Sequence, residues 1–261
     1  MYKKGIDVSK HNGKIDWSKV KAAGIEFAMI RAGYGQSNID ERFKYNVSEC
    51  NRLGIPCGVY WFSYACNEAQ AKKEAQKCLA LIKPYSITYP VAFDFEYDSV
   101  TYAAKMGVKM TKELASKITH AFCKTIEAAG YYVMNYSNAD YLSRFFDTSV
   151  HKAYDLWLAK WPKSPNLKTP PDCGIWQYSS TGKVSGINGN VDLNAAYKDY
   201  EAIITGSRPQ VTKPKTEETE TEADRAKAWV MKKGISDGTN PKSPATREQV
   251  WMMLYRMGGK L

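Results

Sequence analysis

The stretch VAFDFEYDS, residues 91–99, places two acids in a run that otherwise has the composition of a buried β-strand. Successive side chains of a strand point to opposite faces, so Phe93 and Phe95 share one face while Asp94 and Glu96 share the other. Ionised carboxylates are costly to bury unless they are paired or lie at a wet site. The stretch therefore predicts a core strand whose carboxyl end carries two acids into a functional site.

Short β-rich runs alternate with helical patterns over the first two hundred residues. Runs such as GIDVS, FAMIRAGYG, VYWFSY and YYVMNYS are typical of strands, and NEAQAKKEAQKCLALIK is typical of a helix. This rhythm indicates βα units and a mostly parallel sheet. An open doubly wound sheet would carry a glycine-rich phosphate turn after its first strand, and none follows GIDVS. With short, irregular last strands, the sequence predicts an α/β fold, an irregular, flattened, TIM-like β/α barrel over residues 1–205.

The composition changes near residue 205. The stretch TGSRPQVTKPKTEETETEA, residues 205–223, is rich in Pro, Thr and Glu. Residues 206–222 are therefore predicted to form an extended linker. Residues 223–261 show two helical patterns separated by a Gly/Asn/Pro cluster, with Thr246 as a predicted helix N-cap. About forty residues form a weak core alone, so this small helical appendage is expected to need a partner, a second copy or the main domain.

Two further acids are predicted to join Asp94 and Glu96. Asp7 ends the first predicted strand, GIDVS, and Asp192 ends the last, GNVDLN; in a closed barrel these strands are neighbours. Close carboxylates raise the pKa of one member, as glycoside hydrolysis requires of its proton donor. One alternative is that Asp94 and Glu96 only form ion pairs with lysines at the barrel rim. Another is that Asp7 and Asp192 are turn or helix N-cap residues.

Aromatic residues fill the other predicted strand ends, among them Tyr60, Tyr64, Tyr136 and Trp176. Aromatic faces stack on the apolar faces of sugar rings, so a polysaccharide groove would use such residues. Most aromatics in such positions belong to the core, and only a minority is expected to touch substrate.

Several functional classes are disfavoured. The formal charge of +10 is spread along the chain without a concentrated basic stripe, so no nucleic-acid partner is predicted. No segment has the length and apolarity of a signal peptide or a membrane helix, so no membrane partner is predicted. The three histidines lack metal-ligand spacing, which predicts no metal and no cofactor. The six cysteines lack CxxC spacing and are expected to be reduced and mostly buried.

Four segments together resemble the glycoside hydrolase family 25 lysozymes. They are KGIDVSKHNGKIDWSKVKAAGIEFAMIRAGYG, GIPCGVYWFSYA, PVAFDFEYD and GIWQYSSTGKVSGINGNVDLN, in this order over residues 4–204. The resemblance implies an N-acetylmuramidase that cleaves the β-1,4 bond between N-acetylmuramic acid and N-acetylglucosamine in peptidoglycan.

The same resemblance implies roles for individual residues. Glu96 is similar to the family's general acid and Asp94 to its partner carboxylate, which either attacks the sugar or orients its 2-acetamido group. Asp7 and Asp192 are similar to the outer acids that position substrate, and Tyr60, Tyr136 and Trp176 to groove aromatics; Tyr64 is added as a further substrate-binding residue. A chitinase-like hydrolase of N-acetylglucosamine polymers and a non-catalytic, lectin-like wall binder are the alternatives.

The C-terminal pattern AWVMKKGISDGTNP followed by ATREQVWMMLYR resembles part of an S-layer homology repeat. That resemblance implies binding to a secondary wall polymer, and homo-oligomerisation through this segment is the alternative. Without a signal peptide, the chain is expected to be made in the cytoplasm and to act at the bacterial wall after release, as phage endolysins do.

Overall fold

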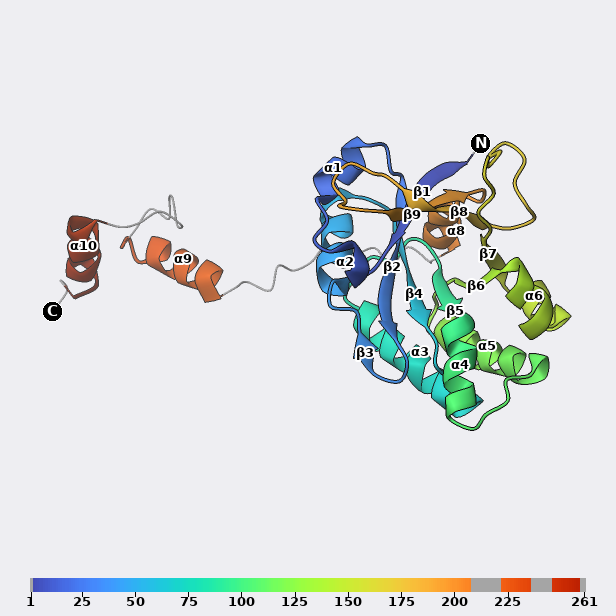
Figure 1. The fold of residues 1–261 in the computed structure, drawn as a ribbon. Coiled ribbons are helices and arrows are strands. Elements are labelled where there is room, and N and C mark those ends of the chain that lie inside the picture. The colour runs from blue at the N-terminus through green and yellow to red at the C-terminus, as the bar shows by residue number, and fades with distance from the viewer. Residues whose placement is uncertain (1, 208–221, 236–245, 259–261) are drawn as a thin grey trace. The chain divides into compact units, whose positions relative to one another are not determined.

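The computed structural model describes residues 2–207, 222–235 and 246–258. The chain divides into two compact units, Met1–Pro209 and Gln210–Leu261. The first contains a sheet wrapped by helices, and the second contains two helices (Figure 1). Each unit is described by itself below.

Eight strands of the first unit close into a barrel, and the predicted α/β barrel is confirmed. Hydrogen-bonded neighbours follow the order β1-β9-β8-β7-β6-β5-β4-β2, and a β1–β2 pairing closes the ring. Every pairing within this ring is parallel except the two made by β9, which runs antiparallel to β1 and to β8. The strands are β1 (Lys3–Val8), β2 (Phe27–Tyr34), β4 (Cys57–Phe62), β5 (Val91–Asp94), β6 (Val133–Asn138), β7 (Asp155–Ala159), β8 (Ile175–Gly182) and β9 (Val191–Ala196), with β3 (Asn38–Ile39) pairing outside the ring on β2.

Helices cover the outside of most strands (Figure 1). They are the short 3-10 turn η1 (Lys10–Asn12), α1 (Trp17–Ala22), α2 (Phe43–Leu53), α3 (Glu68–Ile82), α4 (Tyr97–Lys105), α5 (Lys112–Glu127), α6 (Ala139–Phe145), α7 (Thr148–Ala153) and α8 (Tyr200–Ser207). Their starts follow local sequence, because side-chain oxygens of Asn67, Thr111 and Asp147 cap α3, α5 and α7 by accepting free backbone N–H groups. Residues 160–174, between β7 and β8, form a loop without a helix.

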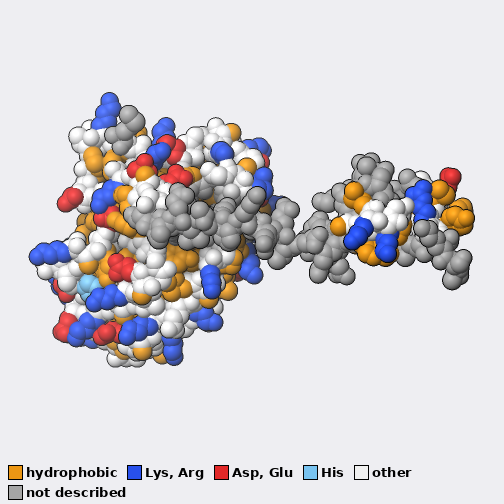
Figure 2. Space-filling model, turned by 180° about the vertical axis from the view of Figure 1, so that it is seen from behind, with side chains coloured by type: hydrophobic (Ala, Val, Ile, Leu, Met, Phe, Trp, Pro, Cys, Tyr) orange, Lys and Arg blue, Asp and Glu red, His pale blue; other side chains and the backbone are white. Residues whose placement is uncertain are grey.

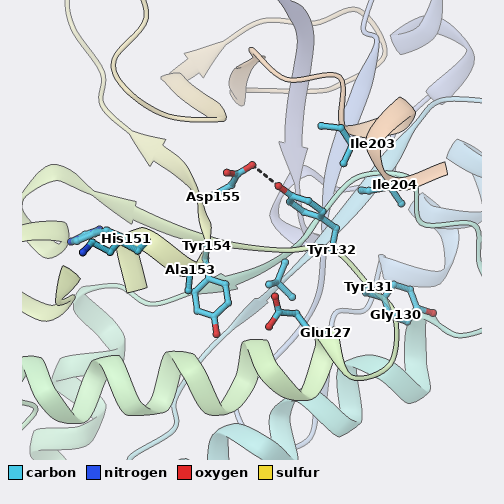
Figure 3. A pocket seen from close by; sticks show the side chains of 12 residues that line it. Glu127, Gly130, Tyr131, Tyr132, His151, Ala153, Tyr154, Asp155, Ile203 and Ile204 are labelled. Atoms are coloured by element: carbon cyan, nitrogen blue, oxygen red, sulfur yellow. Dashed lines mark hydrogen bonds between the residues drawn. The ribbon is translucent and has the colours of Figure 1, made fainter. Parts of the chain in front are cut away.

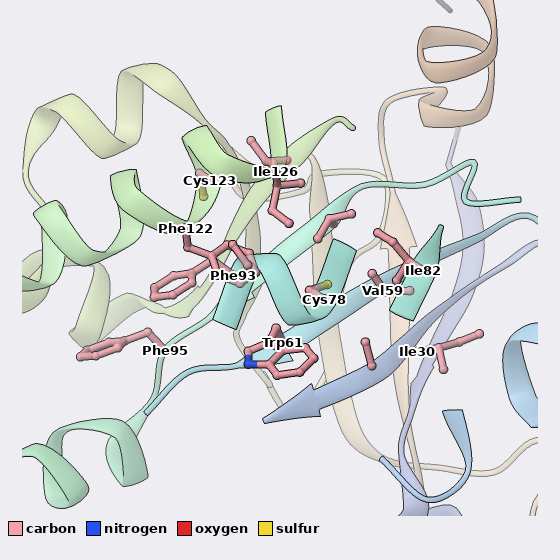
Figure 4. Close-up of a cluster of buried hydrophobic side chains, with 14 of the residues drawn as sticks. Ile30, Val59, Trp61, Cys78, Ile82, Phe93, Phe95, Phe122, Cys123 and Ile126 are labelled. Carbon is pink, nitrogen blue, oxygen red and sulfur yellow. The ribbon is translucent and has the colours of Figure 1, made fainter. Parts of the chain in front are cut away.

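Alternation along the strands produces two apolar layers. Phe93 and Phe95 point outward and pack with Phe122 and Trp61 between the sheet and the helices (Figure 4). Ala92 points inward, into a second cluster that fills the barrel interior. Because Asp94 is two residues beyond Ala92, the same alternation turns its side chain toward the inside of the barrel.

Helix α8 extends the barrel domain past its predicted end at residue 205. Tyr200 and Ile204 are buried in the inner cluster, and the Tyr200 ring lies 5.8 Å from that of Tyr89. Residues 206 and 207, assigned to the linker from composition, belong to this helix because its buried face carries it onto the barrel. The rest of the predicted linker up to residue 221 lies outside the described residues.

The second unit contains α9 (Glu222–Lys232) and α10 (Arg247–Gly258), as the two predicted helical patterns require. The guanidinium of Arg256 donates to the carbonyl oxygen of Ile235 at 3.0 Å, which joins α10 to the end of α9, and Ile235 is buried. Large apolar side chains remain exposed on both helices, including Trp229, Trp251 and Tyr255. The Gly/Asn/Pro cluster between the helices lies outside the described residues.

Surface charge and cysteines are distributed as follows in the part of the chain that the structure describes. Among the described residues seen in Figure 2, Lys and Arg side chains are scattered over the barrel domain and do not form a single band. All six cysteines are free, and five of them are buried. None of the described helices has the length and apolarity to cross a membrane.

Candidate active site

A cavity of about 360 Å³ opens where the parallel strands of the barrel end, and four carboxylates line it. Asp7 comes from β1, Asp94 from β5, Glu96 from the start of α4 and Asp192 from β9. In β/α barrels, this end of the sheet is where reacting side chains collect, because the loops there are free to vary. The structure therefore brings together the four acids that the sequence singled out.

Asp94 and Glu96 form the inner pair. Asp94 is the last residue of β5, and Glu96 is the residue that precedes α4. Glu96 keeps an extended backbone, with φ −134° and ψ −169°, so the strand-like alternation continues for two residues beyond β5. That continuation turns both carboxyls to the cavity while Phe95 between them stays in the outer core.

The two carboxyls of the inner pair interact, and each affects the pKa of the other. Burial raises the pKa of Asp94 well above its ordinary value, and the charges of Glu96 and Asp7 raise it further. Burial also raises the pKa of Glu96, while its hydrogen bond with Asp94 acts in the opposite direction. Such a pair holds one proton between its members over a range of pH, because both cannot ionise freely.

Asp7 and Asp192 form the outer pair. They are directly opposite in the β1–β9 register. Burial raises the pKa of Asp7 well above its ordinary value, and the charge of Asp192 adds to the rise; burial also raises the pKa of Asp192. Asp7 Oδ2 accepts hydrogen bonds from Gln177 Nε2 at 2.9 Å and from Asn194 Nδ2 at 2.7 Å, which fix its orientation.

Asp192 reaches the cavity by a route other than the predicted one. It is the second residue of β9, so it begins this strand and does not end it. Because β9 runs antiparallel to β1, its amino end lies beside the carboxyl end of β1. The predicted neighbourhood of first and last strands is correct, and the prediction that Asp192 ends its strand is wrong.

Two of the four predicted substrate aromatics line the cavity, namely Tyr60 and Tyr136. The Tyr136 hydroxyl donates to Gln177 Oε1 at 3.1 Å, and its ring packs 4.7 Å from that of Trp157. Tyr60 packs edge-on against the same Trp157 ring at 5.8 Å. These contacts hold both tyrosine rings at fixed angles in the cavity wall.

The other two predicted aromatics, Tyr64 and Trp176, are not among the residues that line this cavity. Tyr64 follows the end of β4 and packs its ring 5.2 Å from Phe62 and 5.0 Å from Tyr102. Trp176 is buried, and its indole N–H donates to the carbonyl oxygen of Lys160 at 2.7 Å. Alternation along β8 explains the second case, because Gln177 takes the inward position and leaves Trp176 on the other face.

Gln177 and Arg31 line the cavity without having been predicted. Gln177 bridges Asp7 and Tyr136, and strand parity in GIWQYSS was the signal that could have found it. Arg31 pairs through Nε with Asp40 Oδ2 at 2.8 Å and leaves Nη2 buried without a hydrogen-bond partner. Burial raises the pKa of Asp94, and the positive charge of Arg31 offsets part of that rise.

A second cavity, of about 380 Å³, lies where β6 and β7 begin, at the opposite end of these strands from the acids (Figure 3). Of the charged groups that line it, Asp155 is already satisfied by the hydroxyls of Tyr132 at 2.8 Å and Tyr200 at 2.9 Å and by Lys198 Nζ at 2.6 Å. These bonds join α8 to the barrel, so we assign this cavity a structural role. Among the described residues, no three His, Cys, Asp or Glu side chains are placed to hold a metal ion.

Comparison with known proteins gives this geometry a family. A sequence profile of the glycosyl hydrolases family 25 matches residues 6–187. The chain is 30% identical to Lysozyme M1 of Streptomyces globisporus over 197 residues, which are 73% of this chain and 66% of that protein. It is 32% identical to the modular autolysin LytC from Streptococcus pneumoniae, solved with a synthetic peptidoglycan ligand, with a TM-score of 0.65 over 75% of this chain and 47% of LytC.

A family 25 glycosyl hydrolase from Bacillus anthracis has the same fold, with a TM-score of 0.64 at 24% identity over 78% of this chain and 92% of that one. The matched profile spans more than half of this chain and includes Asp7, Asp94 and Glu96, while Asp192 follows its end. The barrel is thus a glycoside hydrolase domain, and the chain belongs to the glycosyl hydrolases family 25.

Proposed function

We propose that the protein is a lysozyme that hydrolyses the β-1,4 bond between N-acetylmuramic acid and N-acetylglucosamine in bacterial peptidoglycan. The observation that carries the proposal is the placement of the buried Asp94 and the half-buried Glu96 side by side in the cavity at the barrel mouth, where burial raises the pKa of both. The names of Lysozyme M1 and of the peptidoglycan-bound LytC autolysin support the choice of polymer.

Glu96 is the proton donor in this proposal. It is less buried than Asp94, so it is the member of the pair that can reach the leaving oxygen. The shared proton passes from Glu96 to the glycosidic oxygen as the bond from that oxygen to C1 of the muramic acid breaks. After the N-acetylglucosamine unit leaves, the Glu96 carboxylate accepts a proton from the water that attacks C1.

Asp94 orients the substrate's own acetamide in this proposal. In retaining glycosidases in which one carboxylate attacks C1 and the other carboxyl protonates the leaving oxygen, the two groups stand about 5 Å apart. Asp94 and Glu96 lie two residues apart on one extended segment and line the same cavity, and we propose that both lie on one side of the ring, so that the acetamide oxygen attacks C1. Asp94 Oδ1 is buried and accepts no hydrogen bond, and it would hold the acetamide N–H while the cyclic intermediate forms.

The remaining cavity residues would bind the sugar chain. Tyr60 and Tyr136 offer aromatic faces to sugar rings, and Asp7 and Asp192 offer carboxylate acceptors to hydroxyl groups. We propose that Tyr64 and Trp176 contribute outside the cavity only if the bound glycan extends over the neighbouring strand ends.

We further propose that the second unit has one of two roles. It either attaches the enzyme to the wall by binding a secondary wall polymer, or it joins copies of the enzyme by self-association. The exposed Trp229, Trp251 and Tyr255 side chains support an interaction surface of one of these kinds. The enzyme would act at the bacterial cell wall, where its polymer is. The phage-endolysin setting and the S-layer-homology-like anchor are proposals that rest on the sequence patterns alone.

Analysis of the new chain ends tests the proposed reaction. Purified peptidoglycan is digested, the products are reduced with borohydride, and the reduced sugars are identified by mass spectrometry. The proposal predicts reduced muramic acid ends. Reduced glucosamine ends would indicate a glucosaminidase, new amines without new reducing ends would indicate an amidase or peptidase, and binding without any product would indicate a wall-binding protein; each of these contradicts it.

A further inference from the structure

Glu74 is a buried carboxyl that the proposed chemistry does not use. It lies on α3 with no exposed surface, and no Lys or Arg among the described residues forms an ion pair with it. Burying a carboxyl without a cation is costly, and an apolar residue of similar size would be more stable there. Stability alone therefore does not explain a carboxyl at this position.

The carboxyl of Glu74 binds the segment that follows β4. Its Oε2 accepts from the Ser63 hydroxyl at 2.6 Å, and its Oε1 accepts from the backbone N–H of Tyr64 at 3.1 Å. The side-chain amide of Gln36 adds a third bond, to Oε1, at 3.2 Å. Three donors thus converge on Glu74, and two of them belong to residues 63 and 64, directly after the strand that carries Tyr60.

Ser63 in turn holds the backbone of both inner acids. Its N–H donates to the carbonyl oxygen of Asp94 at 2.8 Å. Its own carbonyl oxygen accepts from the Ser99 hydroxyl at 2.7 Å, and the Ser99 oxygen accepts from the backbone N–H of Glu96 at 3.1 Å. All three side chains that make this path, Glu74, Ser63 and Ser99, are buried.

We propose that Glu74 is a positioning residue of the active site, which acts through Ser63 and Ser99 to fix the backbone from Asp94 to Glu96. The path ends in two hydrogen bonds, one from the Ser63 N–H to the carbonyl oxygen of Asp94 and one from the N–H of Glu96 to the Ser99 oxygen. These bonds fix the peptide planes before and after Phe95. The orientation of these planes sets where both carboxyls point. The inference rests on the proposed function, in which the relative placement of these carboxyls determines the rate.

The burial of Glu74 is consistent with this role. Burial raises the pKa of Glu74 to about 7, so both protonation states occur near neutral pH. The short Ser63–Glu74 bond can persist in either state, because each of the two groups is able to donate to the other. Glutamine, a neutral amide of the same shape, keeps the volume but presents an N–H₂ group to at least one of the three donors.

Ser99→Ala and Glu74→Gln test the proposal, with Ser116→Ala as the matched control. Ser116 lies on α5, is as buried as Ser99, and accepts the backbone N–H of Asp147, the residue that caps α7, at 3.0 Å. Ser99 does the same for Glu96, the residue that caps α4. The two serine variants therefore remove the same kind of bond at the start of a helix, one beside the active site and one away from it.

We expect both test variants to lower kcat by about tenfold or more with KM within about twofold, because a misplaced acid slows the chemical step without altering sugar binding. Ser116→Ala should lose a similar amount of thermal stability and keep kcat. The double variant Glu74→Gln/Ser99→Ala should have the kcat of the slower single variant, because both changes interrupt one path.

If kcat of Ser99→Ala lies within twofold of the Ser116→Ala value, the positioning role is wrong; if Glu74→Gln does not fold, this comparison decides alone. Additive losses in the double variant would also overturn it. Failure of the proposed function has a different signature, namely a wild-type protein that releases no reducing ends.

Discussion

Asp7 and Asp192 face one another in register across β1 and β9, the first and last strands of the barrel. The pairing joins the two ends of the barrel domain's strand sequence and places the buried Asp7 and the half-buried Asp192 beside the inner pair. Gln177 and Asn194 hold Asp7 from one side, so the outer pair forms a fixed part of the cavity wall. The pairing of the first and last strands therefore also brings two of the four acids into the site.

Asp192→Asn should move the alkaline limb of the pH profile to lower pH. Burial and neighbouring charges raise the pKa of Glu96, and the charge of Asp192 is one of those neighbours. Removing that charge lowers the pKa, so Glu96 loses its proton at a lower pH and the acid form disappears earlier. The measurement is kcat/KM against pH for both proteins.

Glu201→Gln, which removes an exposed acid on α8, is the control for this change and should leave the profile in place. A shift of the Asp192→Asn alkaline limb to higher pH would show that Asp192 does not act on Glu96 through its charge.

Glu74 should make the folded protein less stable as the pH rises from about 5 to about 7.5. Burial raises the pKa of Glu74 from 4.5 to about 7, so in this window the unfolded chain releases a proton that the folded protein keeps. The free energy of unfolding then falls by about 2 kcal/mol across the window from this group alone. Thermal unfolding of wild type and Glu74→Gln at several pH values measures it.

The difference in Tm, wild type minus Glu74→Gln, should decrease steadily with pH. A constant difference would mean that Glu74 titrates alike in the folded and unfolded chains, and an increasing one would mean that its pKa is lowered by folding.

Tyr200→Ala should destabilise the barrel domain strongly. The Tyr200 ring is fully buried against Tyr89 and Tyr132, and its hydroxyl is one of the donors to Asp155. Loss of a buried aromatic side chain costs about 3–5 kcal/mol, and the loss of one of the three hydrogen bonds to Asp155 adds to this. Urea unfolding measures the change in the free energy of unfolding.

Ile203→Ala on the same helix is the control, because Ile203 is 37% exposed and should cost far less. Equal losses in the two variants would show that α8 contributes by helix formation alone and is not an integral part of the barrel.

Truncation after residue 209 should separate catalysis from attachment. The first compact unit ends there, and the members of both of its apolar clusters lie before that residue. Turnover on soluble glycan fragments should be unchanged, while sedimentation with intact walls, or the solution mass, should fall. Truncation with no effect on either property would contradict a role for α9 and α10 in wall binding or self-association.

The sequence predicted the fold and the acids where local rules suffice. The alternation of Phe93, Asp94, Phe95 and Glu96 needs only strand geometry, and it places the inner pair correctly. The antiparallel direction of β9 could not be predicted, because it depends on pairing with strands far away in the chain. Composition likewise predicted that the barrel domain ends at residue 205. In the structure α8 continues to Ser207, because Tyr200 and Ile204 pack it onto the barrel.

The cavity wall was predicted less well, because many aromatics compete for the same assignment. Trp176 has the chemistry of a sugar platform, but the neighbouring Gln177 takes the inward position on β8. The link from Gln177 to Asp7, and the path from Glu74 through Ser63 to Ser99, join residues far apart in sequence. Such polar networks follow from three-dimensional contacts and leave no pattern in a single sequence.

The turnover of Glu96→Gln on peptidoglycan, followed by borohydride-trapped muramic acid ends, tests the central claim most directly. The variant keeps the shape of the side chain and removes its proton, while Glu113→Gln, an exposed change in the first turn of α5, is the control. We predict a loss of about a thousandfold or more in kcat for Glu96→Gln, with binding, folding and the control unaffected. Turnover within tenfold of wild type would contradict the assignment of Glu96 as the proton donor.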